Sequence, residues 1–255
     1  MPGIRPAAQF LPCQPTAATT PDHRRTAMTT PISQVTETST EPTTSKSRWP
    51  WVGVAAGIGA LAGTLAFDIH PEWDENKAYN ADIVDDISSG KAHGSIIAGY
   101  LTVALLLVLA AAWRRHVEPR TPSSTAARVV PLAFTASAGA LSLGYGWKGA
   151  MGLYNGGNED GTFDKDGLYV LFVLNDFGSF IGYLGVTVAA GAIAWMALRE
   201  RLISRWIGVV SILALLPVIA TVAAFALPGF PGVVGGAWMV AAFAGLALGK
   251  STITR

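Results

Sequence analysis

Six long apolar stretches make up most of this chain, and they constrain its fold more than any other feature. They lie near residues 50–68, 94–113, 129–149, 168–198, 206–227 and 231–249. A helix that crosses the hydrocarbon of a bilayer needs about 17 to 25 apolar residues, and each stretch reaches that length. Charged residues are only 14% of the chain, against about 25% in an ordinary soluble domain. The sequence therefore predicts an all-α fold, a six-helix transmembrane bundle over residues 49–250.

The first 48 residues differ sharply in composition from the rest. The segment "PTAATTPDHRRTAMTTPISQVTETSTEPTTSKSR" is rich in Thr, Pro and Ser and contains few large apolar side chains. Such a segment buries too little apolar surface to offset the entropy cost of becoming ordered. We therefore expect residues 1–48 to form a disordered cytoplasmic tail, and residues 251–255 to form a short cytoplasmic C-terminus.

Positive charge is distributed unequally between alternate loops. Of the 18 Lys and Arg residues, fourteen lie in the tail, the second and fourth loops and the C-terminus, and four lie in the first and third loops. Because translocation disfavours positive charge, this bias predicts a multi-pass plasma-membrane protein with both termini in the cytoplasm. The outer loops are acidic, which either attracts cations through their field or only keeps the loops solvated.

Small residues recur at helical spacing in the first apolar stretch. One face carries Gly53, Gly57, Ala60 and Thr64, and another carries Gly59 and Gly63. Because small residues let helix backbones approach closely, we expect this helix to pack against neighbours on both sides.

Asp176 is the only acidic residue inside an apolar stretch. It lies eight residues after Leu168, or about 12 Å along a helix. The stretch 168–198 has 31 residues, roughly half again the length that the hydrocarbon requires. If its last 20 or so residues form the membrane span, Asp176 lies at the outer headgroup edge.

A polar stripe surrounds this aspartate. Ser179 and Tyr183 follow Asp176 at i+3 and i+7 and share one side of the helix, with Asn175 beside them. Lys148 lies at a matching depth near the outer end of the third stretch, so we expect an ion pair between Lys148 and Asp176. These five residues form the candidate intramembrane polar site.

Other ionisable groups are predicted at a similar height, in an outer polar layer with Asp68, His70 and His93. A metal site built from His70, Glu72, Asp74 and His93 would have suitable ligand types, but the residues lack the tight spacing of zinc sites. No metal and no cofactor are therefore expected.

Three roles fit Asp176. Ionisable residues inside membranes mark ion and proton pathways, so Asp176 is a candidate transport or protonation site. It could instead form a structural pair with Lys148, or simply face the membrane interface. The chain has no Gly-x-Ser-x-Gly elbow, no HExxH pair and no Gly-rich phosphate loop with its Lys, so no catalytic residue is assigned.

Three parts of the chain resemble a broad, uncharacterised class of small bacterial six-span membrane proteins. They are "ADIVDDISSGKAHGSIIAGYLTVALLLVLAAAWRR", "LNDFGSFIGYLGVTVAAGAIAWMALRERLISRWIGVVSILALL" and the Gly-rich last stretch. The class often opens its fifth helix with a Leu-Pro-Arg-Trp-Leu-Gly-like junction, where this chain reads Ile203-Ser204-Arg205-Trp206-Ile207-Gly208. The resemblance implies the architecture and a bacterial plasma membrane, and no activity.

These features favour three functions in order. The first is a non-enzymatic membrane component that acts through helix packing and partners, which are the lipid bilayer and a membrane protein or second copy of the chain. The alternative is a small proton- or cation-coupled transporter or channel that uses Asp176. The third is a membrane enzyme acting on lipid head groups, with His70 and His93 as its only acid or base groups. No nucleic-acid partner is expected.

Overall fold

The computed structural model describes residues 48–70, 80–154, 164–249 and 251–254, without the side chains of Asp176 and Phe177. These residues form helices and turns and contain no strand. The α-helices are α1 (Pro50–Leu61), α2 (Ser89–His116), α3 (Thr125–Tyr154), α4 (Lys165–Ile181), α5 (Leu184–Leu198), α6 (Arg205–Phe225) and α7 (Phe230–Leu248). A π-helical turn, η1 (Ala62–Ala66), continues α1, and short 3-10 turns are η2 (Ala81–Asp86), η3 (Glu118–Arg120) and η4 (Thr252–Thr254). The predicted all-α fold is confirmed, and the predicted tail lies outside the described residues.

Five helical segments in the described part are long and apolar enough to cross a membrane. They are Ser89–Arg120, Thr125–Tyr154, Lys165–Leu198, Arg205–Phe225 and Phe230–Leu248. A sixth apolar segment, Pro50–Ala66, is shorter, and its 17 residues reach about 25 Å. The outward-facing side chains of these helices are largely Leu, Val, Ile and Trp, which suits contact with lipid and identifies a membrane protein.

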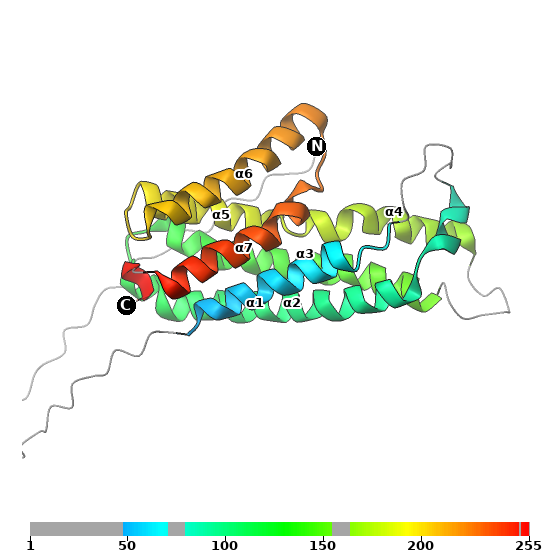
Figure 1. The fold of residues 1–255 in the computed structure, drawn as a ribbon, viewed down its shortest axis with the longest axis horizontal. Helices are drawn as coiled ribbons and strands as arrows, with labels where there is room; N and C mark the ends of the chain where they lie inside the picture. The colour runs from blue at the N-terminus through cyan, green and yellow to red at the C-terminus, as the bar shows by residue number, and fades with distance from the viewer. Residues whose placement is uncertain (1–47, 71–79, 155–163, 250, 255) are drawn as a thin grey trace, which may run out of the picture. The chain divides into compact units, whose positions relative to one another are not determined.

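Neighbouring helices follow a simple pattern of contacts. α2 packs along α3, α1 packs between α2 and α7, and α6 packs on α5 and α7 (Figure 1). α3 carries both α4 and α5, which follow one another along its length (Figure 1). The 30 residues of α3 span about 45 Å, well beyond the hydrocarbon thickness of about 30 Å. The helix is therefore longer than a straight crossing of the hydrocarbon requires, and α4 packs beside its C-terminal part.

The first helix packs on two sides, as its small residues predict. A Cβ at Gly57 would lie 2.8 Å from the carbonyl oxygen of Gly236 in α7, and a Cβ at Gly59 would lie 2.5 Å from Oγ1 of Thr102 in α2. At these two positions the neighbouring helix lies where a side chain would otherwise be. The close approach that glycine permits is the physical basis of the contact.

The fourth apolar stretch lies within one candidate span, Lys165–Leu198. This span contains a turn at Gly182 and Tyr183 that separates α4 from α5. The backbone N–H of Val186, in the first turn of α5, donates to the hydroxyl of Ser137 at 2.9 Å, and this side-chain bond replaces one that a continuous helix would supply. Apolar composition alone does not predict this turn, because the turn involves a hydrogen bond to Ser137 in another helix.

Buried apolar residues form two separate cores. The inner core is made by the buried side chains of α1, α2, α3, α5, α6 and α7, including Phe134, Ile193 and Phe243. The outer core is smaller and consists of Ile69, Ile83, Val84, Ile87, Ala92, Met151, Leu168 and Phe172. The residues that could carry function lie between these two cores.

Candidate functional site

A cluster of polar side chains separates the inner core from the outer core. Along α3, Lys148 lies between Tyr145 of the inner core and Met151 of the outer core. Along α4, the buried residues Asn175 and Ser179 come after Phe172, which belongs to the outer core. We call the following residues the polar cluster: Thr64, Asp68, His70, Ser95, Tyr145, Lys148, Asn175, Ser179 and Tyr183.

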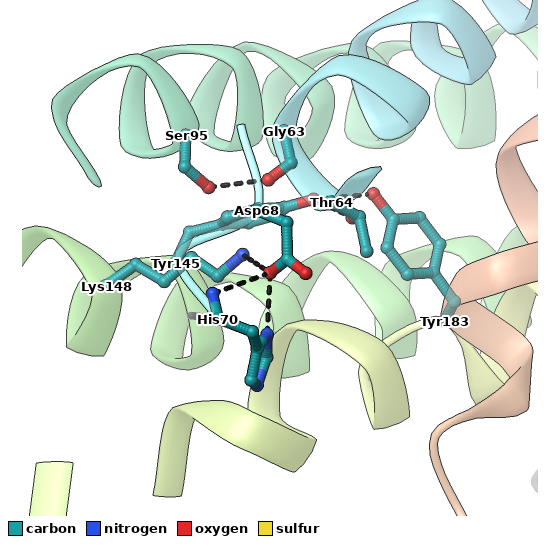
Figure 2. Close-up of polar contacts among 8 residues, drawn as sticks. All are labelled: Gly63, Thr64, Asp68, His70, Ser95, Tyr145, Lys148 and Tyr183. Atoms are coloured by element: carbon teal, nitrogen blue, oxygen red, sulfur yellow. Dashed lines mark hydrogen bonds and ion pairs between the residues drawn. The ribbon is translucent and has the colours of Figure 1, made fainter. Parts of the chain in front are cut away.

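Lys148 is the centre of this cluster. Its side chain is fully buried, with 0% of its surface exposed, and its ammonium group makes no hydrogen bond within the described structure. Its nearest counter-charge there is Asp68, whose Oδ1 lies 4.0 Å from Nζ (Figure 2). An ammonium group loses several kcal/mol of hydration when it is buried, and one partner at this distance compensates only part of that loss.

Asp68 and His70 form a tight pair beside this lysine. Asp68 follows the end of the first membrane helix, and its Oδ1 lies 2.7 Å from Nδ1 of His70 (Figure 2). Because an ionised carboxylate can only accept, Nδ1 carries the proton in this bond. Burial by itself would raise the pKa of Asp68, but the bond and charge of His70, together with the charge of Lys148, lower it below its usual value.

Two aromatic rings hold the imidazole in place. The ring centroid of His70 lies 5.6 Å from that of Phe172 and 6.1 Å from that of Phe180, both in edge-on arrangements. Phe172 and Phe180 are eight residues apart, about two turns, and lie on one face of α4. The pair of Asp68 and His70 is therefore fixed against α4, at the partly exposed edge of the cluster.

Asn175 and Ser179 are buried without a protein partner. Neither the amide nitrogen nor the amide oxygen of Asn175 makes a hydrogen bond in the described structure, and the hydroxyl of Ser179 makes none either. Buried polar groups in native proteins nearly always have partners, and the exceptions mark sites for water, ions or ligands. Together with Lys148, these groups offer hydrogen-bond donors and one strong acceptor between α3 and α4.

A chain of hydroxyl groups closes the inner side of the cluster. The phenol of Tyr145 lies 2.7 Å from the hydroxyl of Thr64 and 2.8 Å from the phenol of Tyr183 (Figure 2). All three side chains are buried, and they connect the π-helical turn of the first helix to the break between α4 and α5. The hydroxyl of Ser95 donates to the carbonyl of Gly63 at 2.5 Å, which supports the same turn.

The helix crossing between α3 and α4 determines where these groups meet. A Cβ at Gly144 would lie 2.5 Å from the carbonyl carbon of Gly178, so the two backbones are almost in contact there. One turn further out, Lys148 and Asn175 lie on either side of this crossing. The glycines thus bring the helix segments that carry Lys148 and Asn175 close together.

Lys148 lies far along α3 from the arginine near the start of that helix. It follows Arg128 by 20 residues, which is about 30 Å of helix. That distance is similar to the thickness of the hydrocarbon of a bilayer.

The structure brings some predicted site residues together and leaves others apart. Lys148, Asn175, Ser179 and Tyr183 are all buried and turned toward the protein, as the polar stripe predicts. The side chain of Asp176 lies outside the described structure, so its pair with Lys148 stays a prediction.

The residues of the predicted outer layer divide in the same way. Asp68 and His70 join the polar cluster, whereas His93 is exposed on α2. Glu72 and Asp74 lie outside the described residues. Of the two histidines that a lipid-modifying enzyme would need, His70 therefore lies in the polar cluster and His93 lies on the exposed surface of α2.

Sequence reasoning missed two members of the cluster, Thr64 and Ser95. Thr64 precedes Asp68 by four residues, a spacing that puts two side chains on one helix face. This spacing could therefore have identified Thr64 as a member of the cluster. Ser95 offered none, because a serine on a helix is equally often paired with its own backbone.

Comparison with protein-family models, curated proteins and solved structures found no match for this chain. Function must therefore be argued from the polar cluster itself.

Proposed function

We propose that this chain is a small proton-coupled membrane transporter, and that the polar cluster is its site of binding and protonation. The observation that carries the proposal is the ammonium group of Lys148, fully buried and without a hydrogen bond in the described structure. Ionisable groups at membrane depth are costly and mark ion and proton pathways. A lysine that served packing alone would be replaced by an apolar side chain of the same length at no loss.

The surroundings of Lys148 support a site for a small polar solute. The polar groups of Asn175 and Ser179 on the neighbouring helix α4 are also buried without a hydrogen bond in the described structure, and a solute or water would satisfy them. The helix break at Tyr183 adjoins the cluster, and broken helices form the binding sites of many transporters. The π-helical turn η1, which carries Thr64, is a second irregularity of the kind that is frequent at functional sites.

Alternating access is a better description of this transporter than an open channel. The cluster reaches the outer side through Asp68, whose side chain is 36% exposed. Toward the inner side lies the apolar inner core, where the hydroxyls of Ser137 and Ser211 already bond to Val186 and Trp238. A continuous polar path across the described bundle would require the helices to move, so this arrangement corresponds to an outward-facing state.

Flux through reconstituted vesicles tests the proposal. The purified protein is placed in vesicles that contain a pH dye, and a proton gradient is imposed with Na⁺ or K⁺ outside. The dye should then report a change in the internal pH. Lys148→Met should abolish the flux, because it removes the charge while keeping the length of the side chain. Lys165→Met, which removes an exposed lysine, is the matched control and should leave flux unchanged. Absence of flux above that of empty vesicles, or equal flux in Lys148→Met and the parent protein, would overturn the proposal.

A second function, that of a membrane component acting through partners, is favoured by α6. Only 22% of the residues in the apolar segment of α6 are buried. The exposed side chains of α6 include Leu213, Leu216, Ile219 and Val222. Lipid covers such a face in a monomer, and another helix covers it in an assembly. Purification in mild detergent followed by native mass spectrometry separates the two, because a monomer without any partner would count against this function.

A further inference from the structure

A groove at the inner end of α2 is a candidate site that the polar cluster does not use. It is lined by Leu107, Ala110, Ala111, Arg114 and Arg115 of α2 and by Thr135 of α3, with a volume of about 480 Å³. The three apolar residues lie deeper along the helix, and the two arginines lie in its last turn. The groove is therefore apolar along its length and cationic at its end.

The two arginines at the end of the groove have no partner in the described structure. Their neighbours do: Arg120 donates to the carbonyl of His116, and Arg128 donates to the carbonyl of Pro122 at 2.7 Å. Arg114 and Arg115 are both exposed, and no hydrogen bond or ion pair joins them to a described residue. Their guanidinium groups are free to bind an anion.

Little negative charge is available nearby to neutralise them. Among the described residues, the two carboxylates at this end of the bundle are Glu118 and Glu200, and Glu200 already accepts from the hydroxyl of Ser124 at 2.6 Å. The arginines at the same end are Arg48, Arg114, Arg115, Arg120, Arg128, Arg199, Arg201 and Arg205. The excess of positive charge requires anions from outside the chain.

We propose that this groove binds one anionic phospholipid. The phosphodiester lies between Arg114 and Arg115, since guanidinium groups match phosphate oxygens in charge and geometry. An acyl chain lies over Leu107, Ala110 and Ala111, in the apolar part of the groove. Basic pockets at helix ends are known to select anionic head groups in this way. A free phosphate would use only the arginines, whereas a lipid uses both parts of the groove.

Lipid binding by the full chain tests this inference. The purified protein is titrated in detergent with phosphatidylglycerol and, separately, with phosphatidylcholine of the same acyl chains, and bound lipid is counted by native mass spectrometry. We expect phosphatidylglycerol to bind about tenfold more tightly, as two basic contacts allow. The double variant Arg114→Gln/Arg115→Gln should lose this preference. The control Arg199→Gln/Arg205→Gln, with the same loss of charge on another loop, should keep it.

A second variant tests the apolar part of the groove. Ala111 is exposed on the groove wall, so Ala111→Trp should fill the space without changing charge and should weaken phosphatidylglycerol binding. Glycerol phosphate, which lacks acyl chains, should fail to displace the lipid at equal concentration. The inference is overturned if the parent protein shows no preference between the two lipids, if both arginine pairs matter equally, or if glycerol phosphate competes fully.

Discussion

Lys148 has opposite expected effects on stability and on transport. Met has a similar length and no charge, so Lys148→Met removes the desolvation loss of the ammonium while Asp68 stays partly solvated and bonded to His70. Replacing a buried ion pair by apolar groups is often neutral or stabilising by about 1 to 4 kcal/mol. We therefore expect the free energy of unfolding, measured by denaturant titration in detergent micelles, to be unchanged or higher.

The same measurement separates the lysine's two roles. If Lys148→Met lowers the free energy of unfolding by several kcal/mol, the lysine is a structural partner of a carboxylate. Its burial would then no longer support a role in transport. Lys165→Met serves as the control, because Lys165 pairs with Asp82 and Asp85 on the exposed surface. Exposed pairs contribute about 0 to 1 kcal/mol.

The hydroxyl chain predicts a graded loss of stability. Tyr145 takes part in two hydrogen bonds and Tyr183 in one. An unsatisfied buried hydroxyl costs about 1 to 3 kcal/mol. Tyr145→Phe removes the partner of both Thr64 and Tyr183, whereas Tyr183→Phe leaves the Tyr145 hydroxyl bonded to Thr64. We expect the unfolding temperature in detergent to be lower for Tyr145→Phe than for Tyr183→Phe. The exposed control Tyr100→Phe should keep the unfolding temperature of the parent protein. Equal unfolding temperatures for Tyr145→Phe and Tyr183→Phe would mean that the three hydroxyl groups do not act as a connected unit.

At the scale of the helices, two glycines of α3 provide a matched pair. A Cβ at Gly144 would meet the backbone of Gly178 at 2.5 Å, whereas a Cβ at Gly139 would meet nothing within 4 Å. Gly144→Ala should therefore separate α3 from α4 and lower stability by about 1 to 3 kcal/mol, as overpacking does. Gly139→Ala should be neutral or stabilising by up to about 1 kcal/mol, because alanine favours helix. Equal unfolding temperatures for the two variants would argue against the backbone contact.

The sequence predicts the helices well and their interruptions poorly. Apolar length predicts the five segments that are long enough to cross a membrane, and small-residue spacing predicts both packing faces of α1, because both signals are local. The break at Gly182 depends on Ser137, 49 residues from Val186, and no local pattern contains that contact. The same holds for the site: the stripe of Asn175, Ser179 and Tyr183 is visible at helical spacing, but the approach of Asp68 to Lys148 depends on how α1 packs.

At the scale of the whole molecule, the charge bias predicts an orientation that labelling can check. Single cysteines are introduced by Ser123→Cys, in the loop between α2 and α3, and by Asp86→Cys, in η2, after Cys13→Ser has removed the native thiol. A membrane-impermeant maleimide applied to intact cells should label the second variant alone, because Arg-rich loops stay in the cytoplasm. Both should react after the cells are lysed. Labelling of the Ser123→Cys variant in intact cells would reverse the assigned orientation.

The two apolar cores imply that the molecule has two cooperative units of different stability. The buried apolar residues fall into two separate clusters, so we expect the outer core to open while the inner core stays folded, as weakly coupled units do. Backbone amides of Lys165–Phe172 should then exchange with deuterium sooner than those of α5, although both belong to one apolar stretch. Lys148→Met should slow that exchange by joining the cores through an apolar side chain. The polar cluster is then expected to set how often the outer core opens and, under the proposed transport function, how often a solute can reach Lys148.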